Sequence, residues 1–151
     1  MNLYDEFFKI IRSFNLAGLK YVVVGGIAMA FHDTPRFTRD VDFLIFPEGL
    51  GKVREILIAE GYFESAQPWT FISTPLTLHR FLKIAEQDEL MIDILLANEQ
   101  RHREIIDLAT SAESEEGPVP IASKEDIVWL KRHRDSDQDR VDIKRLKNDE
   151  D

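Results

Sequence analysis

Two aspartates one residue apart stand at the start of an apolar segment, VDFLIF (residues 41–46), and they are the first residues that suggest chemistry. Asp40 and Asp42 would lie on the same face of a strand, because side chains alternate between the two faces. Asp93 lies inside a second apolar segment, ELMIDILL (residues 89–96). Two close carboxylates repel each other, and burial raises the cost of their charge. A divalent cation would remove both penalties.

Three carboxylates would converge if these two segments pair as neighbouring strands. Oxygen ligands of this kind suit Mg²⁺ or Mn²⁺. Three acids can hold two such ions about 3.5–4 Å apart, an arrangement used for in-line phosphoryl transfer. The sequence leaves a simpler interpretation open, in which these acids form ion pairs at strand edges with Arg36, Arg39 or Arg80.

A pair of glycines, Gly25 and Gly26, follows the predicted strand KYVVV (residues 20–24) and precedes a short predicted helix (residues 27–32). Backbone N–H groups at the start of a helix can bind phosphate, and glycine lets the phosphate approach closely. A glycine pair alone is equally consistent with an ordinary strand-to-helix turn. The combination with two aspartates fourteen residues later is more specific.

The stretch VGGIAMAFHDTPRFTRDVDFLI (residues 24–45) resembles the signature of the nucleotidyltransferase fold shared with DNA polymerase beta. It is most similar to a minimal bacterial branch, the AbiEii-like proteins, in which a glycine pair is followed by H-G-x-x-R-x-T-x-D-x-D. The residues that match this pattern are His32, Arg36, Thr38, Asp40 and Asp42, and Asp93 fits the third carboxylate of the family.

The C-terminal segment IASKEDIVWLKRHRDSDQDRVDIKRL (residues 121–146) resembles the end of the same family. Lys131, Asp139 and Asp142 match by spacing, so the resemblance extends over roughly residues 18–146. Two positions depart from the family: Asp33 stands where glycine is usual, and Ser136 stands where arginine is preferred, with Arg134 two positions early.

The resemblance implies transfer of a nucleoside monophosphate from an NTP to a hydroxyl. Asp40 and Asp42 would then hold the metals and the triphosphate, and Asp93 would join the second metal and help to activate the acceptor. The candidate nucleotide-binding residues are Gly25, Gly26, Arg36, Thr38 and Lys131. Arg36 and Thr38 either bind phosphate or brace the loop, and Lys131 either approaches the phosphates or lies on a solvated helix face.

The remaining histidines and tryptophans favour structural roles. His32 favours a hydrogen bond at the end of a helix. No ligand spacing relates the other three histidines, which are expected at surface or packing positions, and the tryptophans are expected to face the core or a partner. These residues are His79, His102, His133, Trp69 and Trp129.

The order of predicted elements indicates an α/β (α+β) protein with a small mixed sheet, flanking helices and C-terminal helices. We expect one nucleotidyltransferase domain over residues 1–151, with a core at about 18–110 and a C-terminal helical segment at about 123–147. Strands are also predicted near 69–72 and 79–84, a short strand or an extended strap at 118–122, a turn at Gln87–Asp88, and a loop at 111–117. Amphipathic helices are predicted near 3–14, 49–60 and 98–109.

Composition limits the cellular setting and the partners. The chain has 151 residues, a net charge of −9 and no cysteine, which excludes disulfides and thiolate sites and favours the cytoplasm. Neither a signal peptide nor a membrane span is expected. The acceptor is open among protein, small molecule and RNA, although the negative charge disfavours an unaided tRNA acceptor. A homodimer or an antitoxin-like partner is also open, because the nearest relatives suggest a toxin or phage-defence role.

Two other functions compete with an active enzyme. One is a non-catalytic nucleotide-binding or regulatory module that kept the fold, and the other is an interaction protein whose acids serve in ion pairs. The presence of all three carboxylates favours the metal-dependent enzyme.

Overall fold

The computed structural model describes residues 2–32, 40–65, 69–70, 76–134 and 137–148. Its first half contains α1 (Leu3–Leu16), β1 (Tyr21–Val24), α2 (Gly25–Phe31), β2 (Asp40–Ile45), the 3₁₀ helix η1 (Pro47–Gly49), α3 (Leu50–Ala59), β3 (Phe63–Glu64) and β4 (Trp69–Thr70). Its second half contains β5 (Thr77–Ala85), β6 (Asp88–Leu96), α4 (Gln100–Asp107), β7 (Thr110–Ala112), β8 (Val119–Ile121), α5 (Lys124–Arg134) and α6 (Asp137–Asn148).

A mixed eight-stranded sheet runs through the molecule in the order β3-β5-β6-β2-β1-β8-β7, and β4 pairs with β5. The central strand β2 is antiparallel to β1 and parallel to β6. The predicted α/β fold with flanking and C-terminal helices is therefore confirmed. β2 lies in the middle of the sheet with a paired strand on each side, and it is buried along nearly all of its length.

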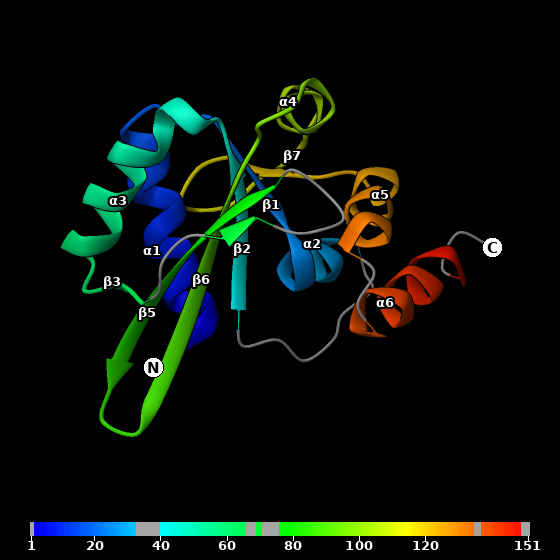
Figure 1. Ribbon diagram of the computed structural model, residues 1–151. Coiled ribbons are helices and arrows are strands. Elements are labelled where there is room, and N and C mark those ends of the chain that lie inside the picture. Colours follow the sequence, from blue (N-terminus) through cyan, green and yellow to red (C-terminus); the bar gives the residue numbers. More distant parts are fainter. Residues whose placement is uncertain (1, 33–39, 66–68, 71–75, 135–136, 149–151) are drawn as a thin grey trace.

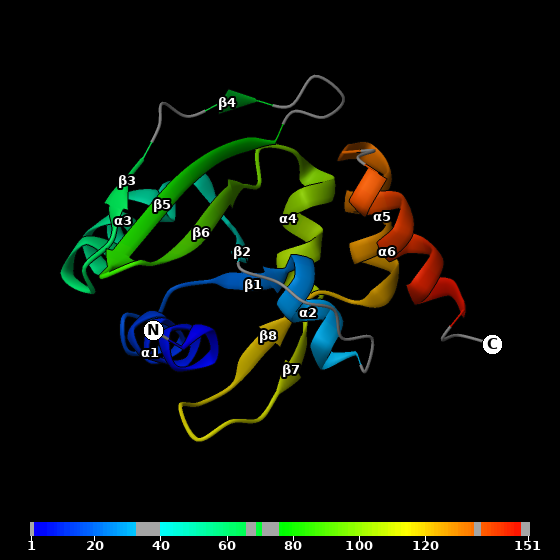
Figure 2. The same ribbon diagram turned by 90° about the horizontal axis from the view of Figure 1, so that it is seen from below.

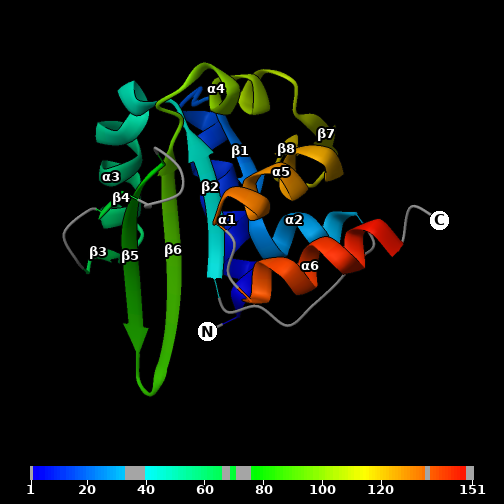
Figure 3. The same cartoon turned by 45° about the vertical axis from the view of Figure 1, so that its right-hand side comes forward.

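Helices cover both faces of the sheet (Figure 1), with α1 and α3 on one side and α2, α5 and α6 on the other. The turned views agree on this layering (Figures 2 and 3). On the α1 side, Phe43 of β2 stacks on Phe7 with a centroid distance of 6.1 Å and meets Phe14 edge-on at 5.1 Å. Because neighbouring residues of a strand alternate, this packing leaves Asp42 facing the α2 side.

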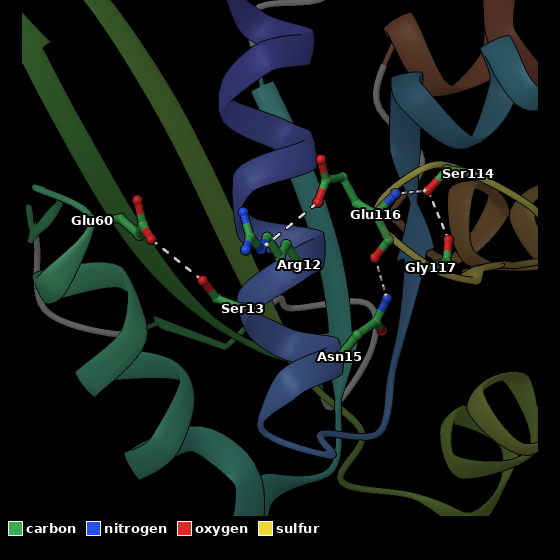
Figure 4. A network of polar contacts seen from close by, with 7 residues as sticks. All are labelled: Arg12, Ser13, Asn15, Glu60, Ser114, Glu116 and Gly117. Atoms are coloured by element: carbon green, nitrogen blue, oxygen red, sulfur yellow. Dashed lines mark hydrogen bonds and ion pairs between the residues drawn. The ribbon is translucent and has the colours of Figure 1, made fainter.

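Polar contacts attach the C-terminal half of α1 to neighbouring segments on two sides (Figure 4). Ser13 donates to Glu60, which follows α3, at 3.3 Å. Asn15 donates through Nδ2 to the carbonyl of Glu116 at 3.2 Å, in the connection between β7 and β8. These contacts hold the helix that buries the apolar face of β2.

Three details differ from the sequence predictions. The expected loop at 111–117 is wrong at its start, because β7 (Thr110–Ala112) pairs antiparallel with β8. The two-residue strand β3 was not predicted, since it carries too few residues for a periodic signal. The hairpin turn lies at Glu86 and Gln87 rather than at Gln87–Asp88, since Ala85 pairs with Asp88 and Glu86 takes a φ of 57°.

No helix within the described ranges is long and apolar enough to cross a bilayer. The division into one domain with a C-terminal helical segment stays a prediction. The helical segment itself consists of α5 and α6, which pack against each other at the right of Figure 1.

Candidate active site

Asp42 and Asp93 lie directly opposite each other on the parallel strands β2 and β6. Adjacent strands are about 4.8 Å apart, so the two carboxylates start from neighbouring points of the sheet. Asp42 is 8% exposed and Asp93 is 4% exposed, whereas Asp40 is half-buried. The structure therefore confirms the strand pairing on which the predicted carboxylate site depends.

Gly25 makes room for the Asp42 carboxylate. Its φ of 73° is a conformation that side chains disfavour, and it begins α2 immediately after β1. A Cβ at this position would collide with Oδ2 of Asp42 and lie 2.9 Å from its Cγ. From the sequence, Gly25 is open between phosphate binding and an ordinary strand-to-helix turn, and the close approach of Asp42 adds a packing reason that neither interpretation contains.

Arg80 of β5 forms a two-pronged ion pair with Asp93. Its Nε donates to Oδ1 at 2.8 Å and its Nη2 donates to Oδ2 at 3.0 Å. Hydrogen bonding to Asp93 raises the pKa of Arg80, and the charges of Asp93, Asp40 and Asp42 raise it further. From the sequence, Arg80 is only one of three possible ion-pair partners of these acids.

Carboxylate oxygens are suitable ligands for a divalent cation, although one of these carboxylates, Asp93, is already paired with Arg80. Carboxylates on adjacent strands are ligands that Mg²⁺ and Mn²⁺ prefer. Within the described part of the chain, no group of three or more His, Cys, Asp or Glu side chains is arranged to hold a metal ion. Asp93 instead directs both carboxylate oxygens to the guanidinium of Arg80.

Lys131 is buried and not on a solvated helix face, so that alternative is wrong. Its Nζ lies 2.9 Å from Oδ2 of Asp142 on α6, and the two side chains are only 4% and 0% exposed. Lys131 also lines a small pocket with Val24 and Gly25. Two of the three C-terminal residues that match by spacing, Lys131 and Asp142, therefore contact each other, and Lys131 lies beside the glycine turn.

The three histidines whose side chains the structure describes have structural surroundings, and the side chain of His133 lies outside the described part. Nε2 of His32 lies 2.7 Å from the carbonyl oxygen of Ala122, which joins the end of α2 to the segment after β8. Nδ1 of His79 lies 2.8 Å from Oε1 of Glu64. His102 is buried and packs edge-on against Trp129 at a centroid distance of 5.4 Å.

Several predicted residues lie outside the described residues. These include Arg36 and Thr38, the two loop candidates for nucleotide binding, and the departures at Asp33 and Ser136. Asp139 lies in α6, but its side chain is not among those described. Gly26 is buried in the first turn of α2.

Comparisons with known proteins give a family and a fold. The sequence profile of a family described as "Nucleotidyl transferase of unknown function (DUF2204)" matches residues 4–150. A comparison with curated proteins finds no match.

Among solved structures, the chain is similar to the lincosamide antibiotic adenylyltransferase LnuA in its lincomycin-bound form. The identity is 20%, the TM-score is 0.61, and 95% of each chain is covered. It is also similar to the antibiotic-resistance factor ANT(2'')-Ia in solution, with 18% identity and a TM-score of 0.62 over 100% of this chain and 86% of that one. A crystal structure of ANT(2'')-Ia with adenylyl-2''-tobramycin matches with 18% identity and a TM-score of 0.59, over 96% and 87%. At these identities the likeness shows the fold.

Proposed function

Because the chain belongs to the family of nucleotidyl transferases of unknown function, we propose that it transfers a nucleoside monophosphate from an NTP to a hydroxyl group of a small molecule or a protein. The observation that carries the proposal is the placement of Asp42 opposite Asp93, with Asp40 two residues before Asp42 on the same strand. Gly25 supports it, because this glycine leaves space for the Asp42 carboxylate at the start of α2.

The proposed reaction is a substitution at the α-phosphorus. The acceptor oxygen forms a bond to this phosphorus, the bond to the bridging oxygen of pyrophosphate breaks, and pyrophosphate leaves. We assign the proton of the acceptor hydroxyl to the carboxylate of Asp93. Positioning of the two reactants by the protein would supply much of the rate.

The chain offers distinct groups for the metal and for the phosphates. Asp40, Asp42 and Asp93 would hold Mg²⁺ or Mn²⁺, which when bound supplies positive charge to the triphosphate. Gly25 and Gly26 would present backbone N–H groups, and the N-cap residue of α2, Val24, makes no side-chain hydrogen bond to them. Arg36, Thr38 and Lys131 complete the proposed nucleotide contacts.

The structural neighbours suggest which substrates to test first. LnuA is described as an adenylyltransferase of lincosamide antibiotics, and ANT(2'')-Ia was crystallised with an adenylylated tobramycin. ATP is therefore the first nucleotide to test, with small hydroxyl compounds as acceptors. A toxin or phage-defence role, an AbiEii-like kinship and a homodimer or antitoxin-like partner rest on the sequence resemblance alone.

A non-catalytic module on the same fold is the second candidate, and the ion pair between Arg80 and Asp93 favours it. An acid that is satisfied by an arginine needs no metal. This candidate predicts nucleotide binding that is insensitive to metal, or no nucleotide binding.

The deciding experiment is label transfer with a matched inactive variant. Each α-³²P-labelled NTP is incubated with the protein, Mg²⁺ or Mn²⁺ and a cell lysate, in parallel with Asp42→Asn. We expect labelled product from the parent and none from the variant, because the nearly isosteric change removes one metal-binding charge. The melting temperature of Asp42→Asn without metal should stay level or rise, since carboxylate repulsion is relieved. Equal label transfer by both proteins would contradict the proposal.

A further inference from the structure

Arg80 places a permanent positive charge inside the carboxylate cluster. Its guanidinium donates one hydrogen bond to each carboxylate oxygen of Asp93, at 2.8 and 3.0 Å. The register explains the placement: Arg80 is opposite Asp93 on the hairpin β5–β6, and Asp93 is opposite Asp42 on β2. The three side chains therefore lie in a row across three adjacent strands.

A metal ion on Asp93 would oppose these two hydrogen bonds through its charge, because each carboxylate oxygen keeps a second lone pair for a ligand. A carboxylate that receives a bidentate guanidinium uses one lone pair on each oxygen in a fixed planar geometry. A metal ion needs an oxygen of Asp93 at about 2.0–2.2 Å and repels the positive guanidinium beside it. Metal binding and the complete ion pair are thus in competition for the same carboxylate.

We infer that Arg80 is the internal counter-ion of these carboxylates when no metal is bound, and that it holds Asp93 in place until a divalent cation displaces the guanidinium from it. The inference rests on the proposed function, because it concerns the same carboxylates. It makes Arg80 a positioning residue that sets how much metal is needed to occupy the site. Side-chain exposure supports the exchange: Arg80 is 31% exposed, so it has a route to solvent, whereas Asp93 is 5% exposed and stays in the sheet.

The inference predicts that one substitution lowers the melting temperature without metal and raises the affinity for Mn²⁺. Arg80→Met keeps an apolar stem but removes the charge and the fork. Without metal, Asp93 loses its partner while it remains buried, so the melting temperature should fall. With Mn²⁺, no guanidinium has to leave, so Mn²⁺ affinity should rise about tenfold, the lower end of what hydrogen bonds to a charged group contribute. Arg80→Lys, which keeps the charge but not the fork, should lie between the two.

The test measures Mn²⁺ binding by electron paramagnetic resonance or calorimetry and the melting temperature with and without Mn²⁺. The matched control is Arg54→Met, which removes the same charge from an arginine paired with Glu64 at 3.1 Å and 38% exposed. Arg54 belongs to α3, on the opposite side of the sheet. The control should leave Mn²⁺ affinity within twofold of the parent.

Tighter Mn²⁺ binding by Arg80→Met than by the parent and the control, together with a lower metal-free melting temperature that Mn²⁺ restores, supports the inference. Unchanged or weaker Mn²⁺ binding by Arg80→Met, or no Mn²⁺ binding by any of the proteins, overturns it. Label transfer is measured separately. A parent that binds Mn²⁺ but transfers no label from any NTP contradicts the proposed function, while the Mn²⁺ comparison still decides the role of Arg80.

Discussion

At the scale of single residues, the site depends on a glycine as much as on its acids. Gly25 adopts a φ of 73°, and its missing side chain is the space that the Asp42 carboxylate fills. The glycine signal was visible in the sequence, but its physical reason was not, because the close contact joins residues 17 positions apart.

Substitution of two glycines with similar backbone angles can separate strain from contact. Gly18 has a φ of 68° and no atom within 4 Å of an added Cβ, so Gly18→Ala should cost only about 1–2 kcal/mol for the backbone conformation. Gly25→Ala adds the collision with Asp42 and should cost about 1–3 kcal/mol more, as overpacking does. The measurement is the free energy of unfolding by urea.

The control for this comparison is a double-mutant cycle. Gly25→Ala should be less destabilising in an Asp42→Ala background, because the carboxylate that the new methyl group meets is gone. Equal costs for Gly18→Ala and Gly25→Ala, or no change in the second background, would mean that Gly25 is not needed to accommodate Asp42.

At the scale of secondary structure elements, the sequence predicted the strands that carry the acids but not the register that gives Asp93 its partner. Alternating and apolar patterns were enough to place β1, β2 and β6. Register depends on the turn: a two-residue turn at Gln87–Asp88 would put Arg80 opposite Leu95, whereas the turn at Glu86 and Gln87 puts it opposite Asp93. Both turns keep Arg80 on the same face, so periodicity could not choose between them.

The contact between the C-terminal helices could also not be predicted from the sequence. The positions of Lys131 and Asp142 matched the family spacing, but spacing along the chain cannot indicate that both are buried. Their contact at 2.9 Å requires α5 and α6 to pack against each other, which is a property of the tertiary structure. A lysine in a charged run of the sequence such as KRHR is more often solvated, but Lys131 is buried beside α6.

Breaking this buried pair should destabilise the protein strongly. Lys131→Met leaves Asp142 charged in a fully buried position, so we expect a loss of about 3–5 kcal/mol in the free energy of unfolding. Lys131→Met with Asp142→Leu removes both charges and should recover most of that loss. The measurement is chemical unfolding at neutral pH. A Lys131→Met protein as stable as the parent would show that the pair does not connect α5 to α6.

At the scale of the whole molecule, charge is the property most closely connected with the acceptor. The chain carries 28 acidic and 19 basic residues, a net charge of −9, and three of the acidic residues form the proposed site. A field of this sign slows the approach of polyanions and favours neutral or cationic molecules. Binding of RNA instead requires cations that neutralise phosphates, and its affinity falls steeply with salt.

We therefore expect the label from an α-³²P-labelled NTP to appear in small molecules or proteins and not in RNA. The measurement divides a cell lysate into purified RNA, protein and a low-molecular-weight filtrate, and tests each as acceptor with the parent and with Asp42→Asn. Transfer to a cationic acceptor should also slow as salt is raised from about 0.05 to 0.5 M, because screening weakens the attraction over that range. Labelling of purified RNA by the parent, absent with Asp42→Asn, would contradict this prediction and leave the transferase itself intact. The rate is measured at saturating NTP, so that screening of the triphosphate does not enter, and a salt-independent rate would then indicate an uncharged acceptor.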